Sequence, residues 1–165
     1  MIKGPNDYTI AQVKEAIRDG LRAVVNTIND KCVIPGAGAF EVACSERLNV
    51  YAKESVTGKA KLGVYAFANA LLVVPRTLAT NSGFDCQDVL LKCLEAHQRK
   101  GEAFGVDVIT GEALPAATAH IWDNYIVKRQ FLNIAPVLCQ QLLLVDEVMR
   151  AGRNMKRGGP SGAEE

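Results

Sequence analysis

The sequence has few aromatic residues, few histidines and almost no net charge. Aromatic residues make up 6% of the 165 positions, and there are two histidines. Lys and Arg (19) balance Asp and Glu (18), so the formal charge of +1 provides no broad basic surface for nucleic acid or anionic lipid. His97 and His120 lack metal-ligand spacing to each other or to any cysteine. We therefore expect no nucleic-acid partner and no metal site.

Paired cysteines and a targeting segment are also missing. The five cysteines are odd in number and form no C-x-x-C pair, which favours reduced structural thiols. The chain opens on MIKGP without an apolar signal region, and no apolar run looks long enough to span a bilayer. We therefore expect a cytoplasmic protein that has no membrane partner.

What is present is the composition of a packed, mainly helical domain. Hydrophobic residues make up 48% and charged residues 22%, which disfavours wholesale disorder. Apolar periodicity predicts helices at about 9–29, 40–51 and 62–78, the last kinked near Pro75. Residues 81–83 predict a helix stop, and Asp85 is predicted to cap the next helix, whose packing face is Val89, Leu90, Cys93, Leu94 and His97. Asp123 is predicted to cap a final long helix that reaches residue 142. Residues 105–112 read as a small hairpin, because β-branched residues flank a polar turn.

The predicted helix at 9–29 has one face built to pack. Its apolar residues recur every three or four positions, at Ile10, Val13, Ile17, Leu21, Val24 and Ile28. Thr9 and Gln12 have capping-box spacing at its start. Asp19 lies roughly opposite the apolar stripe, so it faces either solvent or a ligand.

A glycine-containing turn, Gly36, Ala37 and Gly38, opens the next predicted helix. Exposed N–H groups and the positive end of a helix both favour phosphate. The turn has neither the lysine of a P-loop nor the third glycine of a dinucleotide fingerprint. On this pattern alone it is either an anion site or a tight connection between two helices.

Three isolated acids, Asp19, Asp107 and Asp123, are candidates for holding water, a metal or a ribose. Lone acids on helix faces, in turns and at caps more often have a structural role. The residues by themselves leave both readings open.

Several separated segments resemble the group II chaperonins, in order and in spacing. They are DGLRAV at 19–24, VIPGAGA at 33–39, LATNSGFD at 78–85 and GVDVITG at 105–111. IWDNY at 121–125 and LLLVDEVMRAG at 142–152 resemble the zeta type of the eukaryotic cytosolic chaperonin within that family. The resemblance covers residues 2–152.

The resemblance implies a fold and a domain division. The fold is mainly α: the C-terminal half of an equatorial domain, which is a helical bundle with a small β-hairpin and a terminal strand, plus one intermediate-domain helix. Residues 1–31 correspond to the C-terminal segment of the intermediate domain and 32–152 to the equatorial, ATP-binding half-domain. Residues 153–165 are expected to be a flexible tail.

The resemblance also assigns site residues. Asp19 matches the acid that activates water for attack on the γ-phosphate, a step that depends on positioning and charge compensation. Residues 36–38 match the nucleotide-lining loop, and Asp123 matches the acid that binds the ribose hydroxyls. Lys128 lies near the same pocket, and Asp107 and Gly111 match a hairpin beside the adenine.

Two positions depart from the family pattern, and one motif has no counterpart. Ala37 replaces the middle of three glycines, and Lys31 stands where glycine is common. The Gly-Asp-Gly-Thr-Thr motif that binds phosphate and Mg²⁺ does not occur in the 165 residues, and nothing corresponds to the apical domain. Without those ligands most transition-state stabilisation is lost. We therefore expect this chain alone not to hydrolyse ATP.

The expected function is part of an ATP-dependent chaperone subunit that assists the folding of cytosolic proteins such as actin and tubulin. Its partners would be other chaperonin subunits in a hetero-oligomeric double ring, together with unfolded client proteins. The alternative is a non-catalytic truncated paralogue or interaction module that docks onto chaperonin subunits, since a half-domain bares apolar surface.

Overall fold

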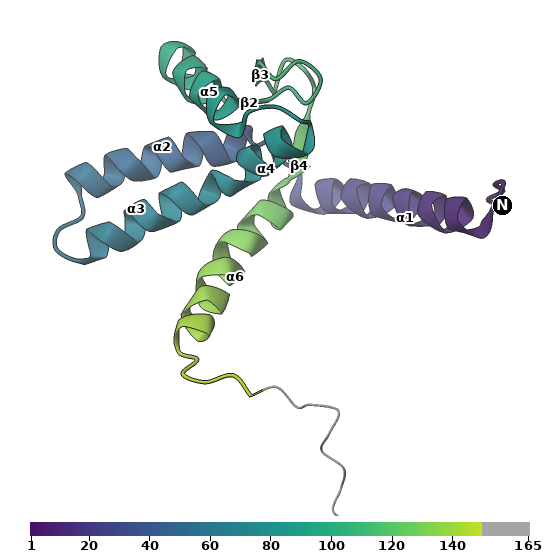
Figure 1. The fold of residues 1–165 in the computed structure, drawn as a ribbon. Helices are drawn as coiled ribbons and strands as arrows, with labels where there is room; N and C mark the ends of the chain where they lie inside the picture. Colours follow the sequence, from purple (N-terminus) through teal and green to yellow (C-terminus); the bar gives the residue numbers. More distant parts are fainter. Residues whose placement is uncertain (150–165) are drawn as a thin grey trace, which may run out of the picture. The chain divides into compact units, whose positions relative to one another are not determined.

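The computed structural model describes residues 1–149 and is mainly helical (Figure 1). Within these described residues, six helices and four three-residue strands occur in the order α1 (Asp7–Asp30), β1 (Val33–Pro35), α2 (Ala39–Glu54), α3 (Ala60–Leu71), α4 (Val73–Asn81), α5 (Cys86–Lys100), β2 (Phe104–Val106), β3 (Ala113–Pro115), β4 (Trp122–Asn124) and α6 (Tyr125–Leu143). The chain forms two compact units, residues 1–129 and 130–165. The core and the site described below belong to the first unit.

Helix α1 begins two residues earlier than its apolar pattern predicts. Asn6, not Thr9, is the N-cap residue, and its side chain accepts a hydrogen bond from the Thr9 backbone N–H at 2.8 Å. The predicted capping box at Thr9 is therefore wrong, because Asn6 has the extended backbone that a cap residue requires. The helix ends at Asp30, and its C-cap residue Lys31 is left-handed with φ 54°. That conformation explains why glycine suits this position.

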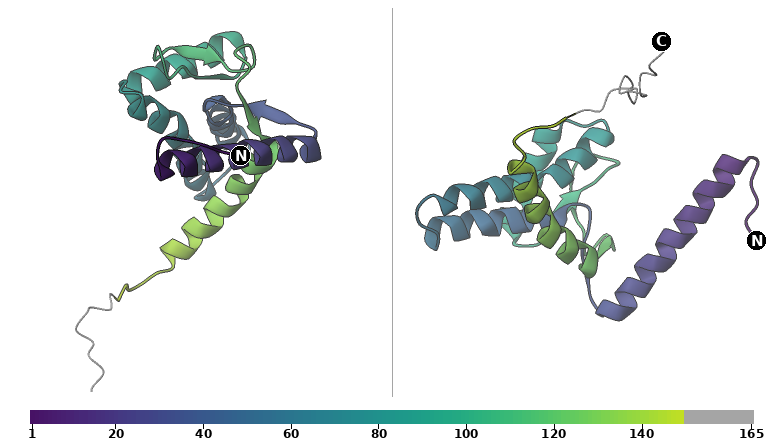
Figure 2. Two further views of the ribbon diagram at one scale, coloured as in Figure 1. Left: turned by 90° about the vertical axis from the view of Figure 1, so that its right-hand side faces the viewer. Right: turned by 90° about the horizontal axis from the view of Figure 1, so that it is seen from below.

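The hydrophobic core lies where α2, α4, α5 and the β2–β3 hairpin meet. α2 also runs beside α3, as Figures 1 and 2 show. The buried core residues are Val42, Leu72, Ala79, Val89, Leu90, Cys93 and Val106. The predicted apolar face of α5 is confirmed at Val89, Leu90 and Cys93. Burial raises the pKa of the Cys93 thiol to about 11, so this cysteine remains a neutral core residue.

The apolar segment predicted at 62–78 is two helices, and the break lies at Leu72 rather than at Pro75. The physical cause is still the proline. Pro75 has no N–H to donate to the Leu71 carbonyl, and its ring crowds that carbonyl, so the first helix must end there. The predicted stop at 81–83 is confirmed, because α4 ends at Asn81 and Gly83 has φ 82°.

One stretch corrects the expectation that no apolar run could span a bilayer. Ala60–Asn81, which covers α3 and α4, is 22 residues long, and the mean hydropathy of its most apolar 18-residue window is 1.4. By length and composition alone it could cross a membrane. A single such segment is weak evidence, because core helices of soluble proteins meet the same criterion.

Two small antiparallel sheets complete the first unit. The predicted hairpin is confirmed as β2 paired with β3, with Gly105 opposite Leu114. β1 pairs with β4, which places Ile34 opposite Asp123. Asp123 is therefore a strand residue, and the prediction that it caps the last helix is wrong. Asp30 binds that helix start instead, its Oδ2 accepting from the Ile126 N–H at 3.1 Å.

The expected terminal strand is not present among the described residues. Residues 145–149 have no regular structure, and the Val145 N–H bonds back to the Leu142 carbonyl in a turn. A strand needs a neighbour for its backbone groups, and none of the four described strands pairs with this segment. The predicted tail at 153–165 lies outside the described residues, and the domain boundary at residue 31 stays a prediction.

Candidate functional site

The Gly36–Gly38 turn connects β1 to the start of α2. The Gly36 N–H donates to the Ile121 carbonyl, and the Ala39 N–H donates back to the Gly36 carbonyl, both at 3.0 Å. Ala37 and Gly38 are left-handed, with φ 55° and 75°. A side chain on Gly38 would also approach Pro75 to 3.0 Å. The turn is therefore tightly packed, and its conformation suits glycine at both positions.

Gly36 leaves room for the side chain of Asp123. A Cβ at position 36 would lie 3.1 Å from Asp123 Oδ1 and 3.2 Å from its Cγ. Since the β1–β4 pairing places Asp123 beside the turn, the missing side chain lets the carboxylate approach the backbone. The Asp123 side chain is 38% exposed, so a ligand can still reach it.

Lys128 joins Asp123 to a second carboxylate. Its Nζ lies 2.7 Å from Asp123 Oδ2 and 2.5 Å from Glu41 Oε1. Burial lowers the pKa of Lys128, but its hydrogen bonds to Asp123 and Glu41 outweigh that effect, and the net pKa is raised. Lys128 therefore stays charged at neutral pH in a largely buried position.

Glu41 is the site residue that the sequence analysis missed. It lies in the first turn of α2 and is fully buried, with its Oε2 lacking any hydrogen-bond partner. In the sequence, Glu41 only stands where a dinucleotide-binding fingerprint would have its third glycine. An acid in the first turn of a helix is favoured by the helix dipole, but nothing in that local signal indicates burial.

The hairpin turn holds Asp107 and Gly111. Asp107 Oδ1 accepts from the Ile109 N–H at 2.9 Å, and Oδ2 accepts from the Thr110 hydroxyl at 2.7 Å. These hydrogen bonds lower the pKa of Asp107. Gly111 has φ 73°, and a Cβ there would meet the Phe84 ring at 2.9 Å. Both residues thus have clear structural roles in the turn.

The hairpin is attached to the glycine turn by its backbone. The Val106 N–H donates to the Ala37 carbonyl at 2.9 Å, and a Cβ on Gly105 would lie only 2.5 Å from that same oxygen. The structure therefore fixes strand β2 directly against the candidate nucleotide loop. Gly105 is needed for that close approach.

Asp19 stands apart from the other predicted site residues. It lies on α1 and is exposed, and its side chain makes no hydrogen bond or ion pair with the described residues. Near its C-terminal end, α1 is held by Asn124, whose side-chain amide donates to the Ala23 carbonyl at 3.0 Å. The first unit thus brings Gly36, Asp123 and Lys128 together, whereas no contact links Asp19 to them.

No cluster of three or more His, Cys, Asp or Glu side chains that could hold a metal occurs within residues 1–149. The residues of the glycine turn and Asp123 fit a nucleotide better than a metal ion. The turn without side chains at positions 36 and 38 and the accessible carboxylate of Asp123 supply the backbone surface and hydroxyl acceptor that a nucleoside phosphate requires.

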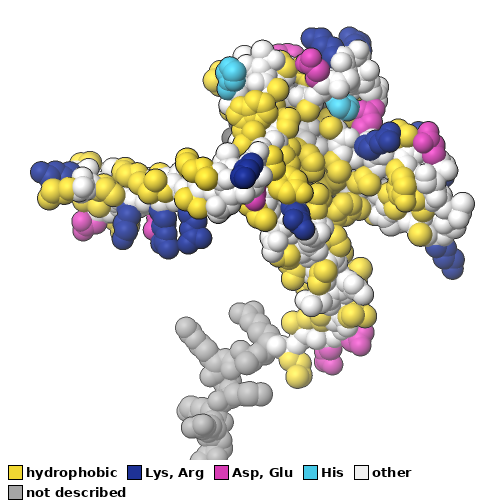
Figure 3. Space-filling model, turned by 180° about the vertical axis from the view of Figure 1, so that it is seen from behind, with side chains coloured by type: hydrophobic (Ala, Val, Ile, Leu, Met, Phe, Trp, Pro, Cys, Tyr) yellow, Lys and Arg dark blue, Asp and Glu magenta, His cyan; other side chains and the backbone are white. Residues whose placement is uncertain are grey.

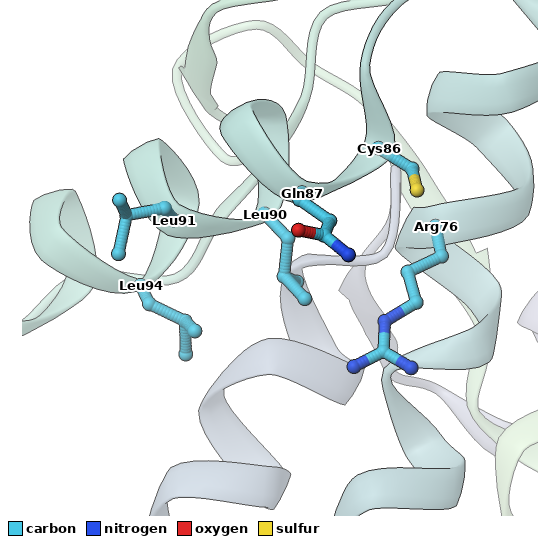
Figure 4. Close-up of a pocket in the computed structure, with 6 residues that line it drawn as sticks. All are labelled: Arg76, Cys86, Gln87, Leu90, Leu91 and Leu94. Atoms are coloured by element: carbon cyan, nitrogen blue, oxygen red, sulfur yellow. The ribbon is translucent and has the colours of Figure 1, made fainter.

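A hollow of about 370 Å³ lies elsewhere, on α4 and α5 (Figure 4). The residues that line it are Arg76, Cys86, Gln87, Leu90, Leu91 and Leu94. None of these belongs to the predicted site, so this hollow does not help to assign the nucleotide position.

The helical fold with its glycine turn and small hairpin is that of a chaperonin half-domain, and the sequence comparison agrees. Residues 1–153 match the TCP-1/cpn60 chaperonin family, and the chain belongs to that family. The mainly helical fold class is also confirmed. The chain shares 30% identity with the open-state monomer of a group II chaperonin from Methanococcoides burtonii, with a TM-score of 0.72 over 86% of this chain and 35% of that one.

Within the family, the chain is similar to zeta-type subunits, as the sequence resemblance indicates. It is 53% identical over 152 residues to T-complex protein 1 subunit zeta-2 from Homo sapiens, covering 92% of this chain and 28% of that protein. It is 52% identical over 157 residues to the same subunit from Mus musculus, covering 95% and 29%. The chain thus spans less than a third of the length of these curated relatives.

Proposed function

We propose that this chain supplies the ribose and base side of an ATP site in a zeta-type chaperonin subunit. The observation that carries the proposal is the position of the Asp123 carboxylate beside Gly36, where the missing side chain leaves room for it against a glycine turn at a helix start. Such a turn presents backbone N–H groups and a positive helix end, both of which favour a phosphorylated ligand.

The remaining site residues have proposed roles that follow the family pattern. Asp123 accepts from the ribose hydroxyls, and residues 36–38 form the loop that lines the nucleotide beside it. Asp107 and Gly111 hold the hairpin that borders the base. Asp19 orients water for attack on the γ-phosphate, and its exposed position on α1 leaves its carboxylate accessible for that role.

The whole protein's activity is part of the same proposal. The subunit would act within a hetero-oligomeric double ring in the cytoplasm and couple ATP hydrolysis to the folding of proteins such as actin and tubulin. The phosphate and Mg²⁺ ligands are not among these 165 residues. The chain alone should therefore bind ATP weakly and not hydrolyse it, because phosphoryl transfer relies on those charges.

ATP binding by the full 165-residue chain tests the proposal. In an NMR titration, ATP should shift the backbone amide signals of residues 36–38. Asp123→Asn should weaken ATP binding about tenfold, because a hydrogen bond to a charged group is lost. Phosphate release with Mg²⁺ should stay at background.

Asp88→Asn is the matched control. Asp88 is an exposed acid on α5 that pairs with Lys92 at 3.0 Å and lies outside the site. It should leave ATP binding unchanged. Equal weakening by both variants, or ATP-induced shifts confined to other segments, would contradict the nucleotide assignment. Mg²⁺-dependent hydrolysis that Asp19→Ala abolishes would contradict the expected inactivity of the chain alone.

A second candidate function is that of a docking module for chaperonin subunits. The observation in its favour is the apolar stripe of α1, which has no buried residue. Figure 3 shows apolar side chains along one side of this helix and charged ones along the other. Ile17, Leu21 and Val24 are 48%, 64% and 57% exposed. An unburied stripe of this kind favours association with a partner.

Co-sedimentation with an intact group II chaperonin ring separates the two functions. A docking module should sediment with the ring, and Leu21→Glu should reduce the bound fraction severalfold by placing a charge in the apolar contact. Arg22→Glu, a charge change at the neighbouring position, is the control for non-specific electrostatic effects. A chain that stays in the supernatant excludes docking and leaves the nucleotide proposal unaffected.

A further inference from the structure

Glu41 is buried more completely than its chemistry favours. Its exposed fraction is 0%, and glutamate is almost never fully buried unless it is paired. The one hydrogen bond of its side chain to the described residues comes from Lys128, while Oε2 is buried without a partner. A buried ion pair often contributes no more to stability than an apolar pair of similar size. Stability alone therefore does not explain why Glu41 is paired with Lys128, and the position of the pair beside the site suggests a functional reason.

Lys128 is the middle member of a chain of three charges. Its ammonium group contacts the buried Glu41 on one side and Asp123 Oδ2 on the other. Of the two carboxylates, only that of Asp123 can be reached from outside. Glu41 and Lys128 come from different helices, so the contact between them fixes where the ammonium group lies relative to the turn.

The ammonium group in turn fixes the orientation of the Asp123 carboxylate. With Oδ2 bound to Lys128, Oδ1 faces Gly36, at 3.1 Å from the place where a Cβ would be. Without Glu41, Lys128 would keep its charge but lose the contact that opposes its pull on Asp123. The carboxylate could then rotate or follow the lysine.

We propose that Glu41 is a positioning residue that holds Lys128 in place, so that Asp123 presents its carboxylate in the orientation that recognises vicinal ribose hydroxyls. The inference rests on the proposed function of Asp123. Glu41 does not touch the nucleotide. Through Lys128 and Asp123, it increases the preference of the site for a ribose over a sugar that lacks the 2′ and 3′ hydroxyl groups.

The test compares ATP with 2′,3′-dideoxy-ATP in NMR titrations of the full chain. The unmodified chain should bind ATP about tenfold more tightly than the dideoxy compound, because Asp123 accepts from the hydroxyl groups. Glu41→Gln has nearly the same shape but no charge. It should reduce the preference to about twofold or less, through weaker ATP binding, and leave the dideoxy-ATP affinity unchanged.

Glu46→Gln is the matched control on the same helix. Glu46 accepts from the Gln98 side chain at 2.6 Å and does not contact Lys128, so this variant should keep the full preference. Should Glu41→Gln not fold, Lys128→Arg provides a second variant. It retains the positive charge but changes the geometry, and it should also lose the preference.

The outcomes distinguish the inference from the function on which it rests. An unchanged preference in Glu41→Gln overturns the inference, and so does an equal loss for both nucleotides, which indicates a purely structural role. An unmodified chain without any preference contradicts the ribose role of Asp123 instead. In that case, thermal unfolding of Glu41→Gln, Asp123→Asn and the double variant tests whether Glu41 positions Asp123. Coupling through Lys128 predicts a deviation of about 2 °C or more from additivity, and additive shifts overturn it.

Discussion

Lys128→Ala is expected to lower the free energy of unfolding by about 3–5 kcal/mol. Lys128 is 8% exposed, and its ammonium group is the hydrogen-bond partner of a fully buried glutamate. Removing it leaves the Glu41 carboxylate inside the protein with no compensating charge. That desolvation cost, rather than the loss of one attractive contact, makes the expected effect large.

Urea unfolding followed by circular dichroism measures this change, and two variants control it. Lys92→Ala removes a lysine that also contacts two acids, Asp88 and Glu112, but all three are substantially exposed. Its expected cost is at most about 1 kcal/mol. The double variant Glu41→Gln and Lys128→Met removes both charges and should recover part of the stability. Similar costs for Lys128→Ala and Lys92→Ala would show that Glu41 is not effectively buried.

Local signals in the sequence predicted those parts of the fold that depend on neighbouring residues. Asp85 caps α5 through the Gln87 N–H at 2.8 Å, as its position before an apolar pattern indicates. Gly83, which has a positive φ, follows the end of α4, and this too can be predicted from the local sequence. Such signals act over two to four residues, so a sequence contains them completely.

Long-range pairing explains why Asp123 was misplaced. Its sequence position before an apolar run resembles that of a cap, but pairing of β4 with β1 gives it a strand conformation. The acid that does bind the start of α6 is Asp30, which accepts from the N–H of Ile126, 96 residues further along the chain. Neither the partner strand nor this substitute cap can be found from periodicity, because both depend on the folded arrangement.

In the candidate site, too, local features can be predicted from the sequence and long-range contacts cannot. The glycine turn could be recognised from its residue types, and its resemblance to a known family added roles for Asp123 and Lys128. The burial of Glu41 depends on a lysine 87 residues away and has no local signature. On α1, the apolar pattern correctly predicted a helix with one apolar face, but amphipathicity does not say what covers that face.

Gly105→Ala is expected to destabilise the first unit by about 2–4 kcal/mol, because it combines overpacking with the loss of a buried hydrogen bond. The added Cβ would lie 2.5 Å from the Ala37 carbonyl oxygen and 2.8 Å from the Ala37 Cβ. These are atoms of the glycine turn and not the end of a flexible side chain. To relieve the contact, strand β2 must move away and lose the hydrogen bond from the Val106 N–H to the Ala37 carbonyl.

Gly63→Ala is the matched control, because nothing lies within 4 Å of a Cβ at that position in α3. Alanine is a better helix former than glycine, so this variant should gain about 0.5–1 kcal/mol. The two substitutions add the same methyl group, and opposite signs in urea unfolding therefore isolate the contact between β2 and the turn. If Gly105→Ala were tolerated as well as Gly63→Ala, the hairpin would not be fixed against residues 36–38. The base side of the proposed nucleotide site would then lose its structural support.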